Sequence, residues 1–137
     1  MSLPKRLKRP RMNVREPSVI RCPGHLKWVR GHMCCLAGRK TEWADPDVRT
    51  IYTMIHVCEG RIEAHHVREG DHGQGMGRKP DDSTAVPLCS FAHKRGHDKG
   101  WKTFEHEWRV DLNSIAEQLW KASPHRAKYL LKQKESL

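Results

Sequence analysis

The clearest hydrophobic pattern lies in the segment DLNSIAEQLWKASP, residues 111–124. Apolar residues recur there at i, i+3, i+4, i+7 and i+8, which predicts a helix with one apolar face. Asp111 is suited to cap the start of this helix, and Pro124 follows its end. We expect the apolar face to pack into the core of the protein, and its residues are Leu112, Ile115, Ala116, Leu119 and Trp120.

Shorter patterns upstream predict two strands joined by a long loop. The segment RIEAHHV, residues 61–67, alternates polar and apolar positions as a half-buried strand does. The segment TAVPLC, residues 84–89, predicts a second short strand, in which Pro87 indicates a sheet edge or a strand end. Between them, residues 68–83 contain four glycines and few apolar side chains, which predicts a loop that is either functional or merely flexible.

Helical patterns flank these two strands. Residues 22–38 show apolar positions at spacings of three and four, enough for one or two helical turns. Ser90 can cap a helix that begins after the second strand and that Gly100 would end. Residues 39–50 carry mixed charge and a proline, so we expect a loop insertion there. Residues 50–58 are rich in β-branched and aromatic side chains but have no clear period.

Composition and charge indicate how the chain divides into domains and what kind of partner it binds. The 137-residue chain is expected to hold one domain, residues 22–124, between a basic arm of residues 1–21 and a C-terminal tail of residues 125–137. Lys and Arg outnumber Asp and Glu by 26 to 16, and the resulting charge of +10 indicates a polyanionic partner such as DNA. The arm is expected to be extended or disordered, and either solubilises the chain or binds phosphates.

The low apolar content suggests that the core needs support. Only 36% of the residues are hydrophobic, and small domains of this kind often depend on a metal ion or on disulfides. No apolar run approaches the roughly 20 residues that span a bilayer. The basic N-terminus also lacks the apolar segment of a secretory signal. We therefore expect a cytoplasmic protein whose five cysteines are reduced and available as metal ligands.

Four histidines carry the candidate chemistry. His65 and His66 are neighbours in the first predicted strand, and His93 and His97 lie at i and i+4 of the following helix. Residues at that helical spacing share one face, so both imidazoles can bind one cation. A third ligand from the strand leaves open coordination positions, which is typical of a catalytic metal site. The order of strand, loop, strand and helix predicts a ββα-metal, or HNH, core.

Three stretches of the chain resemble the Ref-type HNH nucleases encoded by phages. They are EAHHVREG, then GMGRKPDDSTAVPLC, then HKRGH, and the resemblance extends over about residues 22–124. It implies an α+β fold with a ββα-metal core, flanking short helices and hydrolysis of DNA that leaves 5′-phosphate ends. It also implies an association with DNA recombination in the bacterial host, with the RecA filament or another recombination protein as partner.

The resemblance assigns a role to each histidine. His65, His93 and His97 would bind the catalytic ion, and His66 would be the general base that takes a proton from the attacking water. An imidazole with a pKa of roughly 6.5 suits that role near neutral pH. Three imidazoles favour Zn²⁺, Ni²⁺ or Mn²⁺ for tight binding, whereas Mg²⁺ prefers oxygen ligands, and the ion that supports turnover can differ from the one bound most tightly. Basic side chains beside the site are expected to bind phosphates: Arg68, Lys79, Lys94 and Arg95.

The cysteines leave two alternatives open. Many HNH proteins hold a structural zinc with two Cys-x-x-Cys pairs, but here alanines stand where the second cysteine of each pair would be. Cys35 (or its neighbour Cys34), Cys58 and Cys89 can form a three-thiolate site with a histidine such as His56. Alternatively, they are buried as small hydrophobic side chains.

Two further expectations follow. The asparagine that HNH proteins carry before the second strand is replaced here by Thr84, with Asp82 and Ser83 beside it, so the residue that orients the base is left open. Ideal alternation would send His65 and His66 to opposite faces of the strand, so we expect a bulge at residues 64–67 that turns both towards one site. The competing function is a non-catalytic, zinc-stabilised DNA-binding module on the same scaffold.

Overall fold

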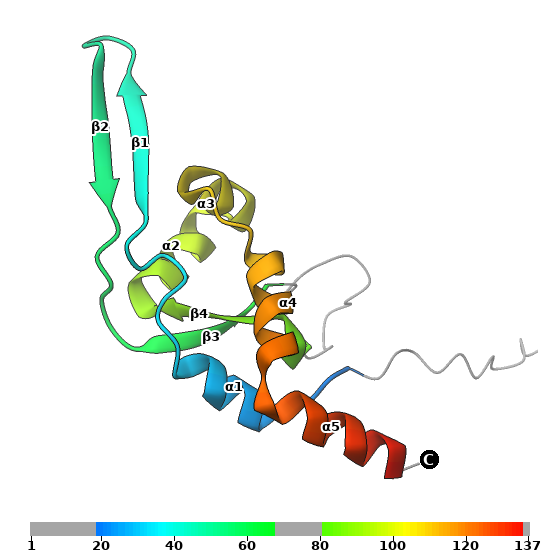
Figure 1. The fold of residues 1–137 in the computed structure, drawn as a ribbon. Helices are drawn as coiled ribbons and strands as arrows, with labels where there is room; N and C mark the ends of the chain where they lie inside the picture. Colours follow the sequence, from blue (N-terminus) through cyan, green and yellow to red (C-terminus); the bar gives the residue numbers. More distant parts are fainter. Residues whose placement is uncertain (1–18, 68–80, 136–137) are drawn as a thin grey trace, which may run out of the picture.

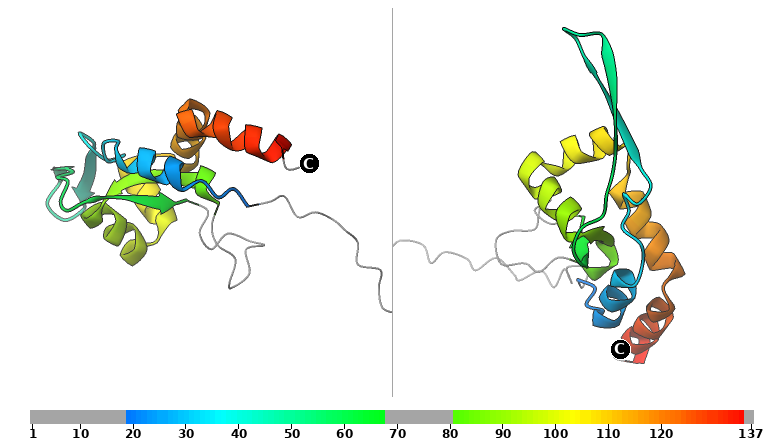
Figure 2. Two further views of the ribbon diagram at one scale, coloured as in Figure 1. Left: turned by 90° about the horizontal axis from the view of Figure 1, so that it is seen from below. Right: turned by 90° about the vertical axis from the view of Figure 1, so that its left-hand side faces the viewer.

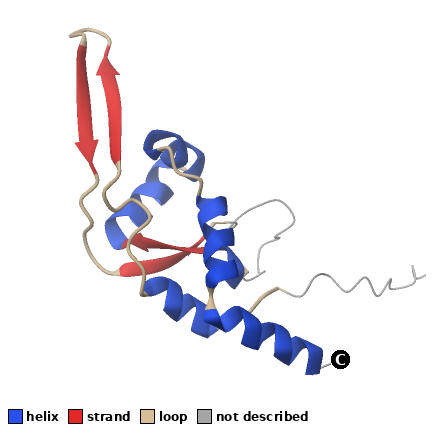
Figure 3. Cartoon of the chain, in the orientation of Figure 1, coloured by secondary structure: helices blue, strands red, loops and turns tan. Residues whose placement is uncertain are grey.

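The computed structural model describes residues 19–67 and 81–135, which form a mixed α+β fold (Figure 1). The expected α+β class is confirmed. Two separate two-stranded antiparallel sheets are present in this part of the chain, with helices packed around one of them (Figure 3). Residues 1–18 of the predicted arm lie outside the described residues, as do Arg68 and Lys79 of the long loop.

The central sheet consists of β3 (Ile62–His66) and β4 (Ala85–Cys89). Their antiparallel register runs without interruption from the pair Ile62 and Cys89 to the pair His66 and Ala85. The Val67 amide continues the ladder by donating to the Thr84 carbonyl oxygen at 3.0 Å. The expected bulge is therefore wrong, because each residue of β3 faces one residue of β4.

Strand β4 lies at the centre of the hydrophobic core. All five of its residues are buried, as expected for an apolar strand covered on both faces. The core combines this strand with residues of the segment 31–39, of three helices and of the turn at 109–111: Cys34, Leu36, Val86, Leu88, Cys89, Ala92, Phe104, Val110, Leu112 and Ala116. The covering helices are α1 (Pro23–Arg30), α2 (Ser90–Lys99), α3 (Trp101–Trp108) and α4 (Leu112–Ala122).

Helix α2 begins directly after β4 and ends at Gly100, which has a φ of +89°. Its cap differs from the expected Ser90, because the Cys89 thiol accepts a hydrogen bond from the Ala92 amide at 3.4 Å. Glycine is required at Gly96, since the ring of Trp101 occupies the space that a Cβ would take. The indole of Trp101 can therefore pack closely against the helix at this position.

The C-terminal helices follow the sequence pattern in part. The Asp111 carboxylate caps α4 by accepting from the Ser114 amide at 3.0 Å, and the predicted face packs inward through Leu112 and Ala116. The segment expected as a tail instead contains helix α5 (Pro124–Glu135), which has no buried residue. No helix in the described part of the chain is long and apolar enough to cross a membrane.

A β-hairpin projects from one side of the fold (Figure 2). It is formed by β1 (Lys40–Asp45) and β2 (Thr50–Ile55), paired so that Trp43 faces Tyr52. These two rings stack at a centroid distance of 4.6 Å. The expected loop at residues 39–50 is thus wrong for β1, whose side chains are mostly exposed and so leave no burial pattern to read.

Candidate metal centres

The first candidate centre joins β3 and α2 through three histidines. His65 is the fourth residue of β3, and His93 and His97 lie one turn apart on α2. One ring nitrogen of each lies within 4.8 Å of the others. The Nε2 atoms of His93 and His97 are 3.1 Å apart. Two nitrogens on one tetrahedral ion at 2.0–2.1 Å would be roughly 3.3 Å apart, so this spacing fits a shared cation.

A carboxylate fixes which nitrogen of His93 is free. The Nδ1 atom of His93 donates to Glu63 Oε2 at 2.8 Å, which leaves the lone pair of Nε2 directed towards His97. The hydrogen bond from His93 lowers the pKa of Glu63, so this partner is an ionised acceptor. Glu63 lies two residues before His65 and therefore on the same face of β3.

His65 is buried without satisfying either ring nitrogen. It is only 2% exposed, and neither Nδ1 nor Nε2 has a hydrogen-bond partner among the described residues. Burial is the largest cause that lowers its pKa, to about 3, and the neighbouring His93 and His97 add to it. The indole of Trp101 stacks on the His65 ring at 3.9 Å. A neutral imidazole that is held rigid and lacks a polar partner is suited to bind a metal ion.

His66 faces a different partner. Its Nε2 atom donates to Asp82 Oδ1 at 3.0 Å, and the His66 side chain is 18% exposed. Asp82 is buried, and its other carboxylate oxygen accepts from the Cys22 amide at 2.8 Å. The Asp82 amide in turn donates to the Ile20 carbonyl oxygen at 3.0 Å. His65 and His66 therefore lie on opposite sides of β3, the first against α2 and the second against Asp82.

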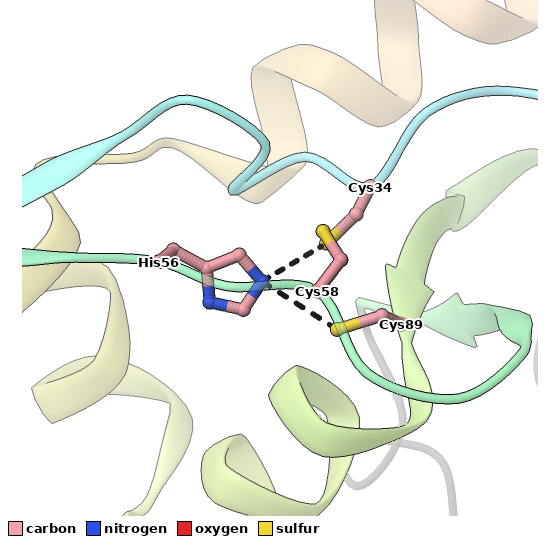
Figure 4. Close-up of side chains that lie close together, drawn as sticks. All are labelled: Cys34, His56, Cys58 and Cys89. Atoms are coloured by element: carbon pink, nitrogen blue, oxygen red, sulfur yellow. Dashed lines mark hydrogen bonds between the residues drawn. The ribbon is translucent and has the colours of Figure 1, made fainter.

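The second candidate centre is a Cys₃His cluster at the base of the hairpin (Figure 4). Its members are Cys34 after α1, His56 and Cys58 after β2, and Cys89 at the end of β4. One ligand atom of each lies within 4.8 Å of the others. The Nε2 atom of His56 is 3.5 Å from the Cys89 sulfur and 3.9 Å from the Cys34 sulfur.

The donor set of this cluster matches a metal ion such as zinc. Three thiolates and one imidazole are a common tetrahedral zinc set, and four protein ligands leave no open position. Burial is the main cause that raises the pKa of Cys34, and it raises that of Cys58 to about 11. The cluster therefore brings together three cysteines that form no disulfide. A bound cation would deprotonate them.

The Cys₃His cluster contains Cys34 rather than the expected Cys35. The Cys35 amide donates to the Pro87 carbonyl oxygen at 2.9 Å, which holds this residue beside β4. Its side chain packs against the core, and burial raises its pKa to about 12. Cys58, Cys89 and the alternative fourth ligand His56 do meet, as expected.

The remaining predicted site residues lie on α2. Lys94 is exposed, and the Arg95 guanidinium lies over the ring of Phe91 at 5.8 Å from its centroid. Sequence reasoning missed Glu63 and the stacking role of Trp101. The i, i+2 spacing of Glu63 and His65 in a strand was the available signal for the carboxylate.

Comparison of the chain with protein-family models, with curated proteins and with solved structures finds no match. The two clusters therefore have to be interpreted from their own chemistry.

Proposed function

We propose that the chain is a metal-dependent endonuclease that hydrolyses phosphodiester bonds in DNA. The observation that carries this proposal is the convergence of His65, His93 and His97 on one point. Three protein ligands leave coordination positions for a phosphate oxygen and water, unlike the closed Cys₃His cluster. The net charge of +10 suits a polyanionic substrate.

We assign β3, β4 and α2 to a ββα-metal core of the HNH type, with the Ref-type phage nucleases as the family it resembles. The support is the order of these elements and the origin of the ligands, one from β3 and two from α2. By that resemblance the enzyme acts in DNA recombination in the cytoplasm of a bacterial host. Stimulation of cleavage by added RecA filaments would support this partner, and unchanged cleavage would argue against it.

In this proposal the chain's own residues divide the work. A divalent cation at the histidine cluster would stabilise negative charge on the phosphate and on the leaving oxygen. His66 is the general base, and Asp82 holds its Nε2–H so that Nδ1 carries the lone pair. His66 and the histidine cluster lie on opposite sides of β3, so the role of His66 rests on the resemblance and on its hydrogen bond to Asp82, and the His66→Ala variant below tests it. Lys94 and Arg95 bind flanking phosphates.

The Cys₃His cluster, in this proposal, holds a structural Zn²⁺. It would join the loop after α1, the base of the hairpin and the start of α2. Metal content by mass spectrometry tests this point with Cys89→Ala. The outlying Cys22→Ala is the matched control, because Cys22 takes no part in the cluster. Loss of one zinc from Cys89→Ala alone is expected; equal zinc in both variants would contradict it.

Conversion of supercoiled plasmid to nicked circles tests the nuclease. Purified protein is incubated with Mg²⁺, Mn²⁺, Ni²⁺ or Zn²⁺, alongside His93→Ala and His66→Ala, with the exposed His106→Ala as control. Cleavage by wild type and His106→Ala, but by neither of the other two, is expected. Activity retained in His66→Ala would contradict the assignment of His66 as the base. Activity retained in His93→Ala would contradict the assignment of the histidine cluster as the catalytic metal centre.

The competing function is a zinc-stabilised DNA-binding module without catalysis. The closed Cys₃His cluster and the position of His66 away from the histidine cluster favour it. Salt-dependent DNA binding by wild-type protein that gives no nicking with any of the four ions would select this alternative.

A further inference from the structure

The hairpin of β1 and β2 exposes apolar side chains on both of its faces. Trp43, Tyr52 and Met54 lie on one face, and Ile51 and Ile55 lie on the other, since directly paired residues share a face. Every residue of β2 is exposed, with Ile51 at 68% and Ile55 at 59%. An isolated two-stranded hairpin is marginally stable in water, and contiguous exposed apolar surface usually marks an interface.

The two edges of the hairpin are not equivalent. Strand β1 carries charged residues at both ends and in its interior, and its Thr41 hydroxyl donates to the Glu107 carbonyl oxygen of α3 at 2.7 Å. Strand β2 reads TIYTMI, with no charge and no proline, and its outer edge has no strand partner among the described residues. Natural edge strands are usually protected by charges, prolines or bulges, so an unprotected edge indicates a partner strand.

The hydrogen-bond ladder identifies the free backbone groups of β2. The His56 amide donates inward to the Arg39 carbonyl oxygen at 3.0 Å, next to the pair Lys40 and Ile55. Bonded and non-bonded pairs alternate along an antiparallel ladder. The amides of Ile51, Thr53 and Ile55 therefore point outward, and an added strand can bond to them.

Charge selects the kind of strand that would add there. Residues 40–55 contain two basic and three acidic side chains, a net charge of −1, whereas the rest of the chain carries +11. The hairpin is therefore unsuited to a phosphate backbone, although a two-stranded ribbon fits the major groove by shape. Two hairpins of net charge −1 repel each other little. Because the hairpin projects from the fold, the strongly basic parts of two paired copies would lie apart (Figure 2).

We propose that β2 pairs with β2 of a second copy of this chain, so that two hairpins form one four-stranded antiparallel sheet. A twofold axis normal to the sheet joins each apolar face to its equivalent, which gives an isologous dimer. Pairing along this edge satisfies the outward amides of β2 and makes the apolar faces of the two hairpins continuous. This dimer does not depend on the proposed nuclease activity.

Sedimentation equilibrium of the full chain across the micromolar range tests the dimer. Wild type is expected to shift from the 15.9 kDa of one chain towards twice that mass as concentration rises. Thr53→Pro removes an outward amide of β2 and leaves the inward ladder intact, so dimerisation should weaken by at least roughly tenfold. Glu42→Pro is the matched control. Glu42 pairs with Thr53, so this substitution removes an outward amide from the opposite edge of the hairpin.

Circular dichroism of both variants checks that the fold is retained. A wild-type protein that stays monomeric throughout the range would overturn the proposal. Equal dimerisation of Thr53→Pro and wild type would overturn it as well. Loss of dimerisation in both proline variants would overturn the assignment to the β2 edge, since only the integrity of the hairpin would then matter.

Discussion

The hydrogen bond between Glu63 and His93 provides a direct test of the histidine cluster as a metal centre. Replacing Glu63 by Gln keeps the size of the side chain but removes the charged acceptor of the His93 Nδ1–H. A neutral amide is a weaker acceptor, so the Nε2 atom of His93 becomes less basic and less well oriented towards a cation. The three ligands themselves are unchanged.

The expected magnitude follows from the geometry of this contact. Carboxylates that orient a metal-binding histidine commonly contribute 10- to 100-fold in metal affinity, or about 1.4–2.8 kcal/mol. The bond is short at 2.8 Å, but the side chain of Glu63 is 43% exposed. Solvent screening therefore places the expected loss near the lower end, at roughly tenfold.

Isothermal titration calorimetry measures the effect. The protein is first loaded with one equivalent of Zn²⁺, which the thiolate-rich cluster prefers, and is then titrated with Mn²⁺. Glu59→Gln is the control, because this glutamate is exposed and lies outside both clusters. Equal Mn²⁺ affinity in wild type and Glu63→Gln would refute the assignment of Glu63, and an absence of Mn²⁺ binding in wild type would refute the centre itself.

Two further predictions concern stability. Burial lowers the pKa of His25 to about 4, with Asp82 opposing it, so the native chain takes up this proton well below the unfolded value near 6.5. The free energy of unfolding should therefore fall by up to about 3 kcal/mol as the pH falls from 6.5 to 4. Urea denaturation at several pH values measures this, and the His25→Gln variant should lack this part of the pH dependence. Gly96→Ala should destabilise the fold by about 1–3 kcal/mol despite its gain in helix propensity, because the new methyl group meets the Trp101 ring; a rise in melting temperature would contradict this.

Local patterns account for the elements that the sequence predicted well. The continuous apolar run of β4 is buried throughout, and the face of α4 packs inward through Leu112 and Ala116 at helical spacing. The pairing of His93 with His97 needs only helical geometry. The meeting of these two residues with His65 depends on β3 lying beside α2, an arrangement that the order of strand, strand and helix predicted.

The missed features depend on contacts that have no local signature. Cys34 and Cys35 are neighbours in a loop. The hydrogen bond from the Cys35 amide to the Pro87 carbonyl oxygen determines which of the two thiols faces His56. A regular ladder replaces the expected bulge because β4 supplies one partner for each residue of β3. The sequence did not predict strand β1, because it pairs with the exposed strand β2 and does not pack into the core.

The two candidate centres meet at the junction of β4 and α2. Cys89 is a member of the Cys₃His cluster, and the same sulfur accepts from the Ala92 amide in the first turn of α2. His93 lies one turn beyond Cys89 on that helix, so the position of its ring depends on where α2 begins. A cation held by the cysteines would fix this starting point in the apolar core. Removing it should therefore disturb the histidine centre, whereas emptying the histidine centre, in which His97 is exposed, should leave the cysteine cluster intact.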